Sequence, residues 1–394
     1  MRKVITMVGT SLFENFLKEK EVDSNYEYFK ENKRRYQELE HEKTRAERLK
    51  SAVRSWIEEF SEEEKLNASA EIKSLYKLKE ELKEELDIYL LASDTILSYL
   101  AGEIIKELLE ELEIGNVHLD VVRGLQIWDR EEFKEGMNNL ITLCYKKAQG
   151  FWGNVIINIT GGYKATIPYL TILAQVNRCP VYYIFEDTDV LIKIPNIPID
   201  INWNIFREYQ EFFRKLEKEK ICELPQELKN NEEIFSLIEV ADNLASFNPL
   251  GLTLWEAYKE RNLFVFISSL AEEYIQRKST QKRIIEKSIK ELLRRLKENP
   301  KDPDLHHSLK NIVLPKGFNT FKDKQENLQI RILYKTEEFL QEDGRKMMDV
   351  YIGLITLGQN VHNAENEYVS TFERNAPKIE NLESYKLYKL TKED

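Results

Sequence analysis

Short apolar runs separated by longer amphipathic segments organise the first 200 residues. The run at 155–159 is the clearest, because its nearly continuous β-branched residues are typical of a strand covered on both faces of a parallel sheet. Similar runs predict further strands at 3–8, 118–122, 180–185 and 190–194. Helical patterns predict helices from Leu12, over 130–149 and over 163–176. This alternation predicts an α/β sheet whose last two strands form a hairpin.

Residues 25–113 are almost free of glycine and proline and rich in Lys, Glu and Leu with helical periodicity. This pattern predicts a set of long amphipathic helices inserted between the first and second strands. Pro195, Pro198 and the polar residues around Trp203 then mark a boundary. We therefore expect a first domain over residues 1–200.

The sequence pattern of residues 201–394 predicts a connector followed by a second folded domain. Residues 201–261 are helical in pattern, with breaks at Pro225 and near Pro249. Residues 262–394 predict strands at 262–267, 319–324, 328–335 and 347–357, with a helix over 279–298. One strand, two helices and an antiparallel meander make a compact α+β domain, so the whole chain is expected to be a multi-domain α/β plus α+β protein.

Composition and hydropathy argue against a membrane-spanning or secreted protein. Of the 394 residues 42% are hydrophobic, yet no apolar run approaches the ~20 residues that span a bilayer, and the N-terminus has no signal-peptide pattern. We expect a soluble cytoplasmic protein without a membrane partner. Cys144, Cys179 and Cys222, like the five histidines, lack metal-ligand spacing, so we expect reduced thiols and no metal.

The strand at 155–159 runs directly into a glycine turn, Thr160-Gly161-Gly162, followed by a helix. Adjacent glycines allow positive φ and close approach of a ligand, and the N–H groups at a helix start attract phosphate. Lys164 adds positive charge and Thr166 a hydroxyl, which favours a polyanion. An ordinary turn whose glycines only permit packing is equally compatible with this pattern taken alone.

A second turn of this kind, Gly9-Thr10-Ser11, follows the first strand and precedes a helix. In doubly wound sheets ligands sit outside the carboxyl ends of strands, so both turns can face one ligand. The hydroxyls of Thr10 and Ser11 can equally cap the helix.

These two turns resemble the ligand-contacting turns of CARF domains, the Rossmann-like sensors of type III CRISPR antiviral defence, over roughly residues 1–200. The resemblance implies a homodimer that binds cyclic oligoadenylate, with cyclic tetra-adenylate favoured, as an activator and no other cofactor. It implies a ligand site formed by Gly9, Thr10, Ser11, Thr160, Gly161, Gly162 and Lys164. The long helical insertion departs from the smallest CARF domains and leaves one wall of the pocket undefined.

The connector resembles, at Ala245–Trp255, the end of a small winged-helix module of the kind that often follows a CARF domain. No basic recognition helix indicates DNA reading. We expect this module to transmit the geometry of the dimer.

The C-terminal third is locally basic although the chain carries a net charge of −11. Residues 261–335 hold 17 lysines and arginines against 9 aspartates and glutamates, which is the electrostatic footprint expected for a phosphodiester backbone. A solvated helix face accounts for part of this excess. It does not account for Lys322, Lys324 and Arg331, because alternation at period two places the two lysines on one face of a strand.

Residues 262–394 resemble the RelE family of toxin ribonucleases in the order of their elements and in the spacing of Lys322, Lys324 and Arg331. The resemblance implies metal-independent cleavage of mRNA on the ribosome, with the 2′-OH attacking the adjacent phosphorus. That reaction needs a base, positive charge on the phosphorane and an acid for the leaving oxygen. We assign charge or base to the lysines, phosphate binding to Arg331, proton transfer to His362, and base stacking or acid catalysis to Tyr368. Many relatives have an arginine where this chain has Asn360.

Two other functions remain open from the sequence. Arg35 and His41 match the loose Arg-x(4–6)-His pattern of HEPN ribonucleases, which an Arg-rich helix also generates by chance. The basic C-terminal domain can also hold nucleic acid without cutting it, as in a ligand-gated regulatory protein.

Overall fold

The computed structural model divides into two units, Met1–Tyr258 and Lys259–Asp394, each with its own sheet and core. It describes residues 1–20, 23–185, 188, 190–261, 264–299, 301–306, 314–340, 346–358, 371–388 and 390. Most of the connector expected at 201–261 lies in the first unit.

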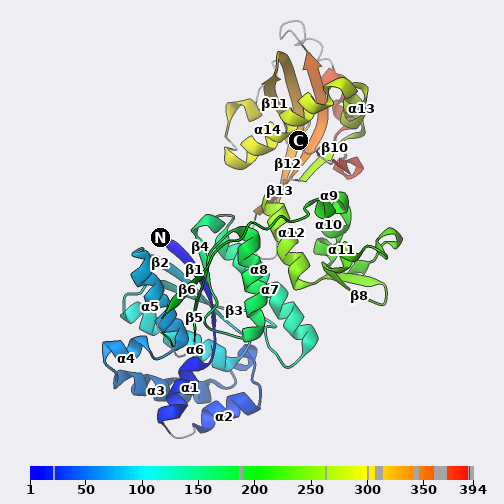
Figure 1. Cartoon of the computed structure of the whole chain (residues 1–394). Helices are drawn as coiled ribbons and strands as arrows, with labels where there is room; N and C mark the ends of the chain where they lie inside the picture. Colours follow the sequence, from blue (N-terminus) through cyan, green and yellow to red (C-terminus); the bar gives the residue numbers. More distant parts are fainter. Residues whose placement is uncertain are drawn as a thin grey trace. The chain divides into compact units, whose positions relative to one another are not determined.

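A six-stranded sheet forms the centre of the first unit (Figure 1). Its strands are β1 (Arg2–Val8), β2 (Leu86–Ala92), β3 (Asn116–Val121), β4 (Val155–Asn158), β5 (Val181–Ile184) and β6 (Leu191–Ile194). They follow the order β3-β2-β1-β4-β5-β6, in which the first five are parallel and β6 pairs with β5 in antiparallel. The expected α/β sheet and its terminal hairpin are therefore confirmed. The strand order is the Rossmann-like one.

The prediction of helices throughout residues 25–113 was wrong for the segment that forms β2. The segment Leu86–Ala92 is a buried parallel strand between β1 and β3, and only Tyr89 is not fully buried. Its residues include Leu and Ala, which are strong helix formers, and its flanks are rich in Lys and Glu. Burial on both faces of the sheet overrides that local preference.

Helices cover both faces of this sheet (Figure 1). One face carries α1 (Ser11–Glu19), α2 (Ser24–Glu31), α3 (Lys43–Glu58), α4 (Glu62–Leu66), α5 (Ala70–Leu82) and α6 (Ile96–Glu111). The other carries α7 (Arg130–Ala148) and α8 (Ile167–Asn177). The insertion predicted over 25–113 thus contains α2–α5 before β2 and α6 after it, whereas α1 is the helix expected from Leu12.

The remainder of the first unit mixes helices with a small three-stranded sheet. Its elements are α9 (Asn204–Glu208), α10 (Gln210–Glu219), β7 (Cys222–Glu223), α11 (Glu232–Phe235), β8 (Ile238–Ala241), β9 (Leu244–Phe247) and α12 (Pro249–Arg261). The β8–β9 hairpin turns at Asp242 and Asn243, both with positive φ, where the sequence pattern indicated only helix. This combination of helices, a short strand and a β-hairpin is compatible with the expected winged-helix-like module. The assignment of the module stays a prediction.

This module is attached to α7 through side chains. The ammonium of Lys134 lies 2.6 Å from the carboxylate of Glu239 and donates to the hydroxyl of Ser246 at 3.1 Å. The Tyr145 hydroxyl donates to the carbonyl oxygen of Thr253 at 2.9 Å. The module is therefore held against the helix that enters β4.

The second unit has a five-stranded sheet in the order β11-β12-β13-β10-β14. Its elements are β10 (Phe264–Ile267), α13 (Ser269–Arg277), α14 (Lys282–Glu298), β11 (Phe318–Gln325), β12 (Leu328–Leu340), β13 (Lys346–Gly358) and β14 (Lys386–Leu387). β10 is parallel to β13, and the other pairs are antiparallel. This agrees with the predicted strand, two helices and meander. Both helices pack on one face through the cluster that contains Ile289 and Ile332.

Candidate functional sites

The two glycine turns lie together at the carboxyl edge of the first sheet. β1 has β2 on one side and β4 on the other, so the direction of winding reverses between β1 and β4. Ligands of doubly wound sheets bind at such a switch point. Gly9–Ser11 follow β1 and Thr160–Gly162 follow β4. The turns predicted from the sequence therefore form this switch point.

Both turns need glycine because their backbones approach closely. Gly162 has a φ of +85°, and a Cβ at that position would lie 2.3 Å from Cβ of Met7. A Cβ on Gly9 would lie 3.0 Å from the backbone nitrogen of Gly162. These conformations and contacts exclude larger residues. The glycines therefore bring the two turns into direct contact.

The carboxylate of Glu71, in the first turn of α5, lies between the two turns. Its side chain is 0% exposed. The backbone N–H of Gly9 donates to Oε1 at 2.7 Å and the hydroxyl of Ser11 donates to Oε2 at 2.9 Å. A Cβ on Gly161 would lie 2.3 Å from Oε1. Two donors that the sequence assigned to a ligand are thus held by a carboxylate of the chain itself.

The same end of α5 also contacts the end of β4. The side-chain amide of Asn158 donates to the hydroxyl of Ser74 at 2.8 Å. Oδ1 of Asn158 accepts from the hydroxyl of Thr160 at 2.7 Å, and that hydroxyl accepts from the N–H of Ile184 at 3.1 Å. Thr160 therefore links β4 to β5, and the start of α5 is hydrogen-bonded to the end of β4.

Thr10 and Lys164 lie on the outer side of the turns. The hydroxyl of Thr10 donates to the carboxylate of Glu14 at 3.1 Å and does not cap the backbone of α1. Lys164 is exposed and begins a short 3₁₀ turn, so the helix expected from Tyr163 starts at Ile167. Burial raises the pKa of Tyr163, whereas hydrogen bonds with Ser93 and Thr95 act in the opposite direction.

The loop after β2 adds polar groups that the sequence analysis missed. Asp94 is 7% exposed, and its Oδ2 accepts from the N–H of Gly124 at 2.8 Å. Its Oδ1 is buried and has no hydrogen-bond partner among the described residues. A buried acceptor of this kind is rare and fits the donor of a ligand. The sequence does contain a signal for this loop, because the polar residues Ser93-Asp94-Thr95 directly follow the apolar run of β2. That run was predicted to be part of a helix, so the loop was not recognised.

In the second unit, strand register brings Lys322 and Arg331 together. Lys322 in β11 pairs with Arg331 in β12, which pairs with Thr356 in β13. Directly paired residues lie on the same face of a sheet, so these three side chains form one row. Lys324 lies two positions further along this face. The two lysines share one face, as expected from their alternation, and the register adds Arg331 to that face, which is opposite the face covered by α13 and α14.

The three side chains differ in exposure. Arg331 is 4% exposed, and its Nη1 donates to the carbonyl oxygen of Ile330 at 3.1 Å. Lys322 is partly exposed and Lys324 is exposed. The other two predicted catalytic residues, His362 and Tyr368, lie outside the described residues, as does Asn360.

Part of the basic charge of the second unit is neutralised locally on α14. Arg295 contacts the carboxylates of Glu291, Asp302 and Asp304 at 2.7, 3.2 and 2.9 Å. Arg294 pairs with Glu291 and Glu298. These pairs hold the pKa of Glu291 at about 2. Two arginines of this region are therefore paired with carboxylates that the excess of positive charge over residues 261–335 already takes into account.

The residues of the alternative ribonuclease pattern have another environment. Arg35 precedes a short 3₁₀ helix, and its guanidinium lies 2.6 Å from the carboxylate of Glu132. His41 is an exposed turn residue. Arg35 is thus engaged in an ion pair with α7, and the pattern does not lie on one continuous helix.

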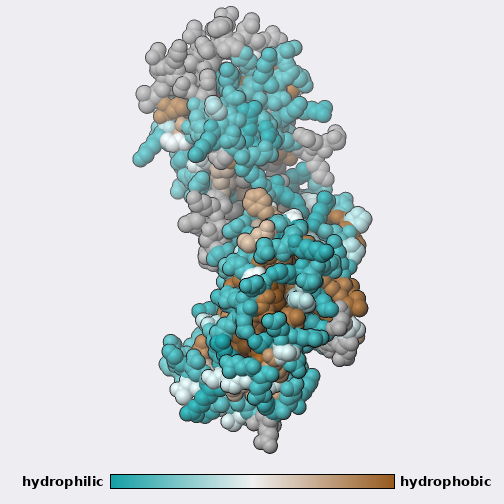
Figure 2. Space-filling model, turned by 90° about the vertical axis from the view of Figure 1, so that its left-hand side faces the viewer, coloured by the Kyte–Doolittle hydropathy of each residue, from teal (hydrophilic) through white to brown (hydrophobic). Residues whose placement is uncertain are grey.

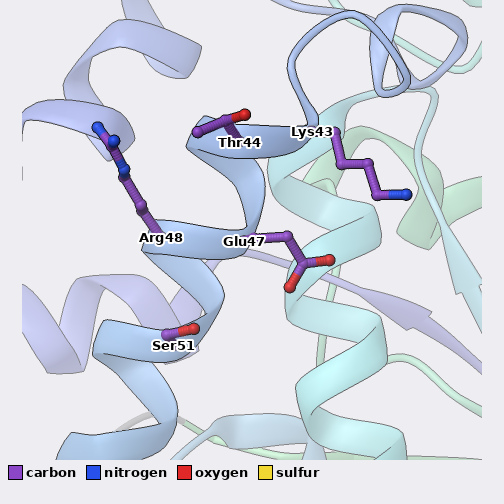
Figure 3. Close-up of a pocket in the computed structure, with 5 residues that line it drawn as sticks. All are labelled: Lys43, Thr44, Glu47, Arg48 and Ser51. Carbon is purple, nitrogen blue, oxygen red and sulfur yellow. The ribbon is translucent and has the colours of Figure 1, made fainter.

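A shallow hollow runs along α3 and is lined by Lys43, Thr44, Glu47, Arg48 and Ser51 (Figure 3). All five come from one helix, and the close-up shows their side chains pointing in several directions. Nothing in this arrangement selects a ligand.

The described part of the chain contains no group of three or more His, Cys, Asp or Glu side chains placed to hold a metal ion. No helix in the described ranges has the length and apolar character needed to cross a membrane.

Comparison with known proteins gives a family match for part of the first unit. Residues 66–197 match the model of a family described as CRISPR-associated protein (Cas_APE2256). The matched range begins just before α5 and includes Glu71 and the second glycine turn.

A solved structure of Can2 from Sulfobacillus thermosulfidooxidans in complex with cyclic tetra-adenylate is also similar, at 12% identity. The similarity covers 67% of this chain and 66% of that one, with a TM-score of 0.21. The chain thus spans just under two thirds of that protein. A TM-score this low supports no conclusion about the arrangement of the fold.

Proposed function

We propose that the chain is an ancillary effector of type III CRISPR defence that is activated by cyclic oligoadenylate, with cyclic tetra-adenylate favoured. The observation that carries this proposal is the meeting of two glycine turns at the switch point of a parallel sheet, within a unit whose residues 66–197 match a CRISPR-associated family. Backbone approach and nearby helix starts suit phosphates. Gly9, Thr10, Ser11, Thr160, Gly161, Gly162 and Lys164 would line the ligand site together with the buried acceptor of Asp94.

The second unit is, in this proposal, a metal-independent endoribonuclease that cleaves mRNA on the ribosome. Support comes from the RelE-like order of elements and from the row formed by Lys322, Arg331 and Thr356. A lysine and an arginine paired side by side on one strand face suit a scissile phosphate and its developing charge. His362 and Tyr368 would provide proton transfer and base stacking.

The active form is proposed to be a homodimer that shares one cyclic ligand. Exposed apolar residues of the first unit, including Ile172, Ile197 and Ile199, support a surface for a second copy. Ile197 lies beside α8, because its N–H donates to Gln175 at 2.9 Å. Figure 2 shows hydrophobic residues gathered on the first unit and framed by hydrophilic ones. For a useful switch the ligand must favour the active arrangement by about 3 to 5 kcal/mol.

The test is incubation of the full chain with ribosomes, message and each cyclic oligoadenylate in turn, with cut positions mapped against codon register. We expect cleavage only with the activating ring. Arg331→Ala and His362→Ala should abolish cleavage and leave ligand binding unchanged. Loss of cleavage in His41→Ala alone would instead establish the HEPN-type reaction.

A non-catalytic regulatory protein is the second candidate, and the 4% exposure of Arg331 is the observation that favours it. A guanidinium this buried does not reach a scissile phosphate without a rearrangement. Ligand-dependent RNA binding without cleavage, under every combination of ring and ribosome, would support this function.

A further inference from the structure

Glu71 is unusual because it is a fully buried carboxylate at a site that suits anions. A buried charge is tolerated only when hydrogen bonds compensate its lost hydration. Here the compensation comes from the N–H of Gly9 at 2.7 Å and the hydroxyl of Ser11 at 2.9 Å. Both groups are donors, and both belong to the turn after β1.

The same two donors are the ones a phosphate would need at this turn. Hydrogen bonds from donors to a negatively charged oxygen are strong, and each N–H or O–H serves one such acceptor well. The carboxylate also fills the space beside Gly161, where even a Cβ would lie 2.3 Å from Oε1. In position and in charge, Glu71 takes the place of an anionic ligand.

Glu71 belongs to an element that can respond to its release. It lies in the first turn of α5, where the hydroxyl of Ser74 accepts from Asn158 at the end of β4. One face of α5 is thereby joined to both glycine turns. A change at Glu71 is transmitted directly to the helical insertion.

We propose that Glu71 is a built-in competitor of the activating ligand, and that an anionic oxygen of the ligand replaces its carboxylate on Gly9 and Ser11. This inference rests on the proposed function of the first unit and specifies how that site is regulated. Without ligand the carboxylate holds α5 against the turns. With ligand the carboxylate is released and α5 loosens.

A purely structural role for Glu71 makes the opposite prediction for ligand affinity. If the carboxylate only braces the turns beneath the ligand, weakening it disorders the site and lowers affinity. If it competes, removal of its charge raises affinity, because a nearby like charge opposes binding of a phosphate.

The test compares the full-length wild-type chain with Glu71→Gln, using cyclic tetra-adenylate as the probe and calorimetry as the measurement. Gln has the shape of Glu, can still accept from Gly9, and can donate to Ser11, so the turns keep their packing. We expect the Kd to fall by about tenfold or more. Glu80→Gln is the matched control, because Glu80 is exposed on the same helix and changes the net charge equally. Its Kd should remain that of the wild type.

Hydrogen exchange on the wild-type chain gives a second readout that does not depend on any variant. Amides at the start of α5, over residues 70–75, should exchange faster when the ligand is bound. An unchanged or higher Kd in Glu71→Gln, or greater protection of α5 in the complex, would overturn the inference while leaving ligand binding itself intact. Absence of binding by both proteins would instead refute the proposed function, and this inference with it.

Discussion

Gly9 and Gly162 face each other across β1 and β4 with so little space that a methyl group on Gly9 would lie 3.0 Å from the nitrogen of Gly162. The two residues are more than 150 positions apart in the chain, yet they form one surface. A side chain at Gly9 would press against the backbone of Gly162, and one at Gly162 would collide with Met7, so both glycines are needed for the close approach of the two turns.

Gly162→Ala should destabilise the first unit and abolish ligand binding. The φ of +85° disfavours alanine, and the new Cβ would lie 2.3 Å from Cβ of Met7. Strain of this kind costs about 1 to 3 kcal/mol. Thermal unfolding and calorimetry with cyclic tetra-adenylate measure the two effects.

Gly153→Ala is the control for that substitution, because no atom lies within 4 Å of the Cβ it would add. Its stability and affinity should match those of the wild type. Equal behaviour of the two variants would show that the turn does not require glycine at residue 162.

Gly161→Ala and Glu71→Ala should show non-additive effects on stability. The Cβ added at Gly161 would lie 2.3 Å from Oε1 of Glu71, so the single variant forces the carboxylate out of its place. Truncating Glu71 first removes that clash. A double-mutant cycle on unfolding free energies should give a coupling of about 0.5 to 3 kcal/mol, and additive effects would contradict the contact.

Lys324→Ala should reduce ribosome-dependent RNA cleavage without lowering stability. The residue is exposed on the strand face that carries Lys322 and Arg331, so its removal takes away charge but little packing. Lys316→Ala changes the net charge equally at an exposed turn before β11 and serves as the control. Cleavage rates with saturating activator distinguish the two, and an equal loss in both would indicate only general electrostatic attraction.

Stability of the second unit should fall as the pH drops from about 4.5 towards 2. Hydrogen bonds from Arg294 and Arg295 lower the pKa of Glu291 from 4.5 to about 2. A carboxyl group whose folded pKa is depressed stabilises the fold above its unfolded pKa, and this contribution disappears as the pH falls through the folded value. Hydrogen exchange in α14 across this range measures the effect.

Glu291→Gln should make that pH dependence shallower and lower the stability at neutral pH. Glu326→Gln, in an exposed turn between β11 and β12, should change neither. A pH profile that is identical in wild type and Glu291→Gln would contradict the role of this network.

Strands with strong β-branched signals were predictable, and strands built from helix-forming residues were not. Val155–Asn158 carries its own signal, because consecutive Val and Ile favour a buried strand. Leu86–Ala92 has no such signal, and its state depends on β1 and β3, which flank it only in the folded sheet. The β8–β9 hairpin was missed in the same way, although Asp242 and Asn243 are typical turn residues.

The candidate ligand site shows the same limit. Glycines and small polar residues directly after an apolar run indicate a turn, so both turns were found from the sequence. Glu71 was not identified from the sequence, because a glutamate in the first turn of a helix has the pattern of an ordinary solvated residue. Its contact with Gly9 joins segments 62 positions apart and exists only after α5 docks on the sheet.

The central place of β1 has a consequence for how the chain acquires its structure during synthesis. β1 is synthesised before the other strands of its sheet, yet it pairs on both sides. Its partners are β2, which begins at residue 86, and β4, which begins at residue 155. Loop closure over such distances is slow compared with the formation of local helices. We expect α1–α5 to form before β1 can pair on both sides, so that nascent chains that do not yet include β4 carry helices but no complete ligand site.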